Sequence, residues 1–117
     1  MRKRYELKTI EQYGEDCLVY LLGEGSESDK IVRFSSMQRY LPAAIRWVEN
    51  LSVIGESKKI IVLATFSLMK TKFVSSDEQG LASYWIDHQL PELIDQIVLL
   101  ARSKALVKQG LRLCSIL

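Results

Sequence analysis

The sequence predicts an α/β fold, with an α+β arrangement as the alternative. Two short runs, residues 17–23 and 58–66, are apolar along nearly their whole length and rich in residues favoured in strands, as expected for strands covered on both faces. Two longer stretches, 35–55 and 76–110, repeat apolar residues three and four positions apart, which is typical of helices that cover a sheet. We therefore expect a single mixed sheet of about five strands covered by two or three helices, in the order β-β-β-α-β-(β)-α-β.

The first third of the chain predicts three strands. Residues 4–14 alternate in a period of two, Gly14 with its acidic neighbours suits a turn, and residues 17–23 follow as a second strand. After the polar, glycine-rich loop 23–29, residues 30–35 form the third strand. Because the three segments are close in sequence, an antiparallel meander is the simplest pairing.

The middle of the chain predicts a helix and then a buried strand. Ser35 or Ser36 can cap a first turn, Pro42 suits the first position of a stable helix, and Gly55 suits its C-terminal cap. Residues 58–66 follow as the central strand, and residues 67–74 fit either an adjoining strand or a loop.

The last third predicts a helix and a final strand. Ser76 and Gln79 have the spacing of a capping box, Pro91 interrupts and restarts the helix, and Gly110 ends it. Residues 111–117 then alternate as a strand, which completes a right-handed βαβ unit.

The size and composition indicate one globular domain over residues 1–117. The hydrophobic fraction of 48% and the charged fraction of 26% are ordinary for a chain of 117 residues that builds its own core. No apolar run approaches the roughly 20 residues that span a bilayer, and no apolar stretch follows the basic N-terminus as in a signal peptide. We therefore expect a cytoplasmic protein that does not bind membranes, with Cys17 and Cys114 as buried thiols.

Catalytic and metal-binding motifs are scarce. His88 is the single histidine, and the sequence has no Cys-x-x-Cys, His-Glu-x-x-His, Walker or dinucleotide motif. Glu6-x-Lys8 matches a short nuclease signature but has no acidic residue before it, and the carboxylates Asp77, Glu78 and Asp87 fit a solvated helix face. We expect no cofactor and no metal, and we expect the protein not to be an enzyme.

One candidate binding site is the serine pair Ser75 and Ser76. A helix N-terminus attracts a phosphate, whether it belongs to a ligand or to a phosphoserine. Asp77 and Glu78 in the first turn would repel that anion, so helix capping is the alternative explanation.

The segment FVSSDEQGL, with the preceding KKIIVLATF, resembles the STAS domains of anti-sigma-factor antagonists, regulatory modules with a phosphorylatable serine at a helix N-terminus. The Asp-Ser-Ser-Gly core of that family would need Asp where Val74 stands, and Gly80 comes three residues late. These departures leave the chain unassigned to the family.

Two functions remain in view. The first is a non-enzymatic regulatory or protein–protein interaction module that self-associates, with Trp85 as a candidate interface anchor. The alternative is a small nucleic-acid-binding protein that uses the basic N-terminus and a basic C-terminal helix. The basic residues of that helix are Arg102, Lys104, Lys108 and Arg112.

Overall fold

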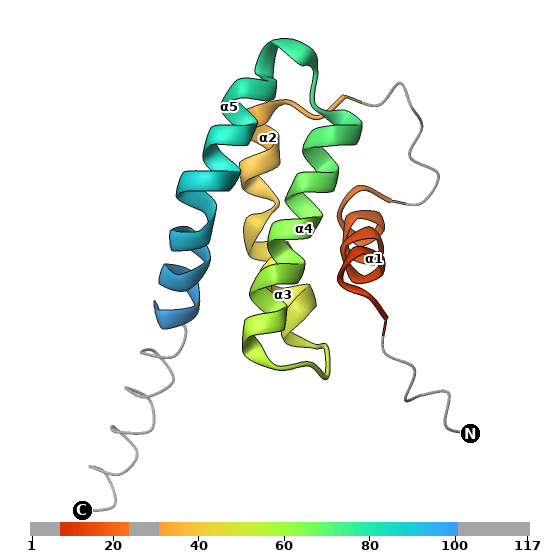
Figure 1. Ribbon diagram of the computed structural model, residues 1–117, viewed down its shortest axis with the longest axis vertical. Helices are drawn as coiled ribbons and strands as arrows, with labels where there is room; N and C mark the ends of the chain where they lie inside the picture. The colour runs from red at the N-terminus through yellow and green to blue at the C-terminus, as the bar shows by residue number, and fades with distance from the viewer. Residues whose placement is uncertain (1–7, 24–30, 101–117) are drawn as a thin grey trace, which may run out of the picture.

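The computed structural model describes residues 8–23 and 31–100, and its regular structure there is entirely helical (Figure 1). The elements are α1 (Ile10–Leu22), α2 (Phe34–Arg39), α3 (Leu41–Glu49), α4 (Gly55–Phe73), a 3-10 turn (Ser76–Glu78) and α5 (Gln79–Tyr84). A π-helical segment (Trp85–Gln89) continues α5 into helical residues 90–100. None of the described residues forms a strand, so the prediction of an α/β or α+β fold around a mixed sheet is wrong.

Helix α4 lies at the centre of the molecule. It runs between α1 and the long helix that starts at α5, and α2 and α3 complete the bundle (Figure 1). Its buried side chains are Ile61, Val62, Thr65, Phe66, Met69 and Phe73. The predicted strand 58–66 and the undecided segment 67–74 both belong to this helix up to Phe73. The apolar run is continuous because helices cover α4 from more than one side, which is the burial that we attributed to a central strand.

Helix α1 occupies most of the described part of the two strands predicted over residues 4–14 and 17–23, and it includes Gly14, where a turn was predicted. Thr9 and Gln12 form a capping box: the Gln12 amide donates to Thr9 Oγ1 over 3.1 Å, and the Thr9 amide donates to Gln12 Oε1 over 2.9 Å. Gly14, Cys17 and Leu18 are buried at helical spacing. Gly14 faces α4, where a glycine lets the two helices come close, and so it does not form a turn.

The third predicted strand, residues 30–35, is not formed in its described part, residues 31–35. Residues 31–33 are irregular, although the Val32 amide donates to the Phe73 carbonyl over 2.9 Å, and α2 already begins at Phe34. Ser35 and Ser36 lie inside α2, so neither is its N-cap.

The predicted helix around Pro42 is confirmed as α3. Pro42 lies in its first turn, and the predicted apolar face is buried at Leu41, Ile45 and Val48. Its end differs from the prediction, because Asn50 is the C-cap and Gly55 opens α4.

The predicted helix from Ser76 is confirmed through residue 100, and Pro91 does not break it. The five residues before Leu90 are π-helical, and the Leu90 amide donates to the Trp85 carbonyl. A proline ring crowds the preceding turn and has no amide to donate, and the wider π turn accommodates both. The capping box predicted for Ser76 and Gln79 is not formed.

Three aromatic rings organise the core. Trp85 is 2% exposed and meets Phe66 and Phe34 edge-on, with ring centroids 5.5 Å and 6.1 Å away. The strand predicted for residues 111–117 lies outside the described residues. Across the described helices, none is both long enough and apolar enough to span a membrane.

Candidate functional site

The serine pair Ser75 and Ser76 lies in the turn between α4 and α5. The Ser75 hydroxyl donates to the Asp77 carboxylate, and this hydrogen bond is the main cause of a lowered Asp77 pKa. Ser76 opens the 3-10 turn and is exposed. The helix that follows as α5 has only six residues before the π segment, and an ionised carboxylate already lies beside Ser75. These observations favour the structural explanation of the serine pair over a phosphate site.

The next two residues of this turn hold three segments together. Glu78 accepts from the Phe34 amide over 2.9 Å and from the Arg33 guanidinium over 3.2 Å, so it caps α2 from a distant part of the chain. The side-chain amide of Gln79 donates to the backbone carbonyls of Lys70 and Val74, over 2.8 Å and 2.7 Å, at the end of α4. The stretch SSDEQ is therefore a structural junction.

The remaining predicted site residues do not form a binding surface together with this junction. Trp85 lies in the core, so its indole is not accessible to a partner of the folded chain. Arg102, Lys104, Lys108 and Arg112 lie outside the described residues, as does Cys114. The described residues carry eight basic and ten acidic side chains, a net charge of −2.

Cys17 is a buried thiol, as expected. It is 0% exposed and hydrogen-bonded to Thr65, whose hydroxyl donates to the Ile61 carbonyl over 2.8 Å. Burial raises the pKa of the Cys17 thiol to about 11, although the bond to Thr65 acts in the opposite direction. A thiol in this state is protonated at neutral pH and is not a nucleophile. No group of three potential ligands that could hold a metal ion occurs among the described residues.

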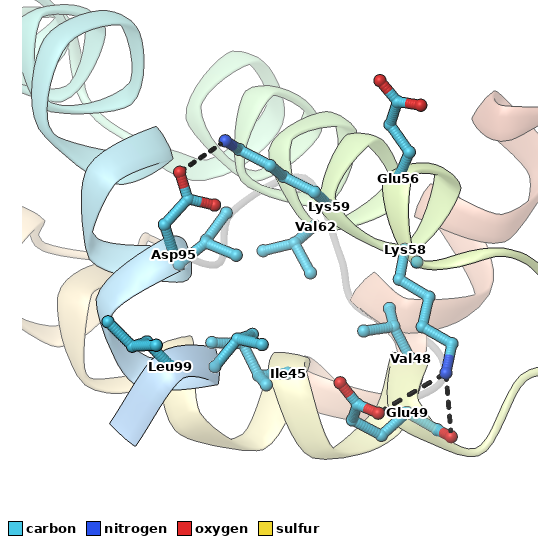
Figure 2. Close-up of a pocket in the computed structure, with 12 residues that line it drawn as sticks. Ile45, Val48, Glu49, Glu56, Lys58, Lys59, Val62, Asp95 and Leu99 are labelled. Atoms are coloured by element: carbon cyan, nitrogen blue, oxygen red, sulfur yellow. Dashed lines mark hydrogen bonds and ion pairs between the residues drawn. The ribbon is translucent and has the colours of Figure 1, made fainter. Parts of the chain in front are cut away.

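The described residues form a cleft that the sequence did not indicate. It has a volume of about 530 Å³ and lies between α3, the first turns of α4 and the helical residues 94–99. Its apolar lining comes from all three helices and consists of Ile45, Val48, Val62, Ile94, Val98 and Leu99. Figure 2 shows these helices around the apolar floor. The volume and lining fit a binding surface.

Two ion pairs stand on opposite sides of this floor (Figure 2). Lys59 Nζ lies 3.0 Å from the Asp95 carboxylate, which links α4 to the last helix. Lys58 Nζ lies 3.4 Å from Glu49 Oε1 and equally far from its carbonyl oxygen, which links α4 to α3. Glu56 extends away from the floor, so the rim carries three carboxylates and two ammonium groups.

One leucine extends the apolar surface at one end of the cleft. Leu99 lines the cleft and is nevertheless 65% exposed. Singly exposed leucines are common on protein surfaces, but Leu99 borders an apolar recess. This combination of floor, rim and Leu99 is the candidate site, which we call the α3–α4 cleft.

Comparison with known proteins gives no family for the chain. No family model matches the sequence, and neither the curated proteins nor the solved structures include a significant match. The resemblance to STAS domains also loses its structural basis, since the segment KKIIVLATF is part of α4 and not a strand.

The residues of the cleft were missed for a specific reason. Ile45, Val48, Ile94 and Val98 were recognised as apolar helix faces, but both faces were expected to cover a sheet. Gly55, Lys58, Lys59 and Val62 are spaced i, i+3, i+4 and i+7, and they share one face only when the segment is helical. That spacing was the available signal.

Proposed function

We propose that the protein is a non-enzymatic interaction module that acts by self-association. The observation that carries this proposal is the α3–α4 cleft, an apolar recess with a charged rim and the exposed Leu99 at its end. Burial of such apolar surface is the main driving force of protein association.

The test is the molar mass of the full chain in solution. Sedimentation velocity and light scattering from low micromolar to submillimolar protein should show a reversible increase in mean mass above 13.4 kDa. A chain that stays monomeric throughout this range, and that also recovers no partner in cross-linking from its native cytosol, would refute the proposal.

The nucleic-acid alternative receives no support from the described residues. Their net charge is −2, and the basic residues named for that function lie outside them. Affinity for nucleic acid depends on neutralising phosphates and falls steeply with salt. A gel-shift assay at low salt with single-stranded and duplex DNA and RNA tests this alternative, and retardation that disappears with added salt would revive it.

A further inference from the structure

We propose that two copies of the chain associate face to face through the α3–α4 cleft, about a two-fold axis, with Leu99 of each copy packed over the apolar floor of the other. This inference rests on the proposed self-association and adds its surface, its partner and its symmetry. It uses only described residues: the floor, the two ion pairs of the rim and the exposed leucine.

The first argument is the shape of the apolar surface. The floor is recessed between three helices, whereas Leu99 at its end is 65% exposed. A surface that presents a recess and an adjoining apolar side chain can be complementary to a copy of itself, because each side chain finds a recess across the interface.

The second argument is the charge of the rim. The pair Lys59–Asp95 lies on one side of the floor and Lys58–Glu49 on the other (Figure 2). A two-fold axis across the cleft places Leu99 over the far end of the opposite floor and brings each ion pair against the same pair of the second copy. Because each pair contains both signs, an ammonium group of one copy can face a carboxylate of the other, as an isologous interface requires.

The same rim disfavours occupants of uniform charge. A nucleic acid would meet three carboxylates, and a polybasic segment would meet two ammonium groups, so each would place like charges together. A small apolar ligand would fill the floor but would leave most of Leu99 in water, whereas ligand sites usually enclose most of the molecule that they bind. A second copy covers the floor and Leu99 at once.

The chain offers a matched control on the same continuous helix. Leu81 of α5 is 57% exposed, close to the value for Leu99, but it does not line the cleft. Since both side chains lie mostly in water, a glutamate at either position should leave the monomer folded. The two substitutions therefore separate loss of the interface from a general effect of added charge.

The experiment compares the full-length wild type with Leu99→Glu and Leu81→Glu by sedimentation velocity over the same concentration range. We expect Leu99→Glu to raise the dimer dissociation constant at least tenfold, and Leu81→Glu to change it less than twofold. Circular dichroism checks that both variants keep their helical content, and Leu99→Ser replaces Leu99→Glu if the glutamate unfolds the chain. In a mixture of isotope-labelled and unlabelled wild type, isotope-filtered NMR should show contacts between Leu99 and Val62 of different copies.

The outcomes are distinguishable. A wild type that dimerises while Leu99→Glu leaves its dissociation constant unchanged overturns this inference and leaves self-association standing. A wild type that is monomeric at every concentration overturns the inference and removes the main support of the proposed function. Dimerisation without filtered contacts between Leu99 and the cleft also overturns it, in favour of another face or another occupant of the cleft.

Discussion

Substitution of Gly14 tests the packing of α1 on α4 most directly. A β-carbon at this position would lie 3.4 Å from Ala64 Cβ, 3.5 Å from Leu68 Cδ1 and 3.5 Å from the Thr65 amide nitrogen. These distances are ordinary van der Waals contacts, so one methyl group fits without displacing α4. Atoms beyond the β-carbon would press on the Ala64 and Leu68 side chains and on the backbone at Thr65.

The two substitutions at Gly14 should change the free energy of unfolding differently. Glycine inside a helix is about 1 kcal/mol less favourable than alanine, so Gly14→Ala should be neutral or stabilise the fold by up to that amount. Gly14→Leu overfills the contact and should destabilise it by about 2 kcal/mol, because α1 must move away from Thr65.

The assay is urea unfolding followed by far-UV circular dichroism, with the midpoint and slope fitted for each variant. The control is Gly80→Ala in α5, where nothing lies within 4 Å of the added β-carbon, so only the helix preference of alanine acts. A Gly14→Leu chain as stable as the wild type would refute the close approach of the two helices. A Gly14→Ala chain destabilised by more than about 1 kcal/mol would instead show that the two helices leave no room for one methyl group.

Three further predictions concern named contacts. Glu78→Ala should lower the free energy of unfolding by about 1–2 kcal/mol because the Phe34 amide loses its acceptor, and Glu78→Gln should lose less; urea titration measures both. In a Cys114→Ser background, Cys17 should react with iodoacetamide only when the chain unfolds, because its thiol is buried. The raised pKa of Cys17 should also stabilise the fold. This contribution is complete below the pKa of an unfolded thiol and is lost as the pH rises toward about 11. Ser75→Ala should raise the pKa of Asp77, which a carboxyl NMR titration measures. In the wild type, the lowered pKa of Asp77 adds stability above the ordinary aspartate pKa, and this stability is lost as the pH falls through the pKa of the folded chain. An unchanged Asp77 pKa in the variant would exclude the hydrogen bond from Ser75 as the cause of the lowered pKa.

The sequence predicted two helical regions correctly because their apolar residues repeat at a helical period next to polar faces. α3 has one apolar face with Pro42 in its first turn, and residues 90–98 form a similar stripe. Both segments are covered on one side, which is the condition under which periodicity identifies a helix.

Helix α1 was misread for a different reason. Some of its apolar residues are exposed, Val19 to 44% and Tyr20 to 56%. The segment 17–23 is therefore apolar along its sequence although only part of it is buried in the structure. The sequence around Gly14 predicts a turn, but a glycine is also common where two helices approach closely, as they do at Gly14. The capping box at Thr9 and Gln12 was the local signal that favoured a helix.

Helix α4 shows how one misread element concealed the candidate site. A short apolar run has the same composition in a buried strand and in a helix surrounded by others, and only the residues after it decide. Phe66, Met69 and Phe73 continue the run at spacings of three and four, which favours a helix. In a strand, neighbouring residues point to opposite faces, so Lys58 and Lys59 could not both border one surface. In the helix they do, and each binds a carboxylate on a different neighbouring helix, which is why the floor of the cleft has a rim of both signs. The cleft and its charged rim are therefore a consequence of α4 being helical.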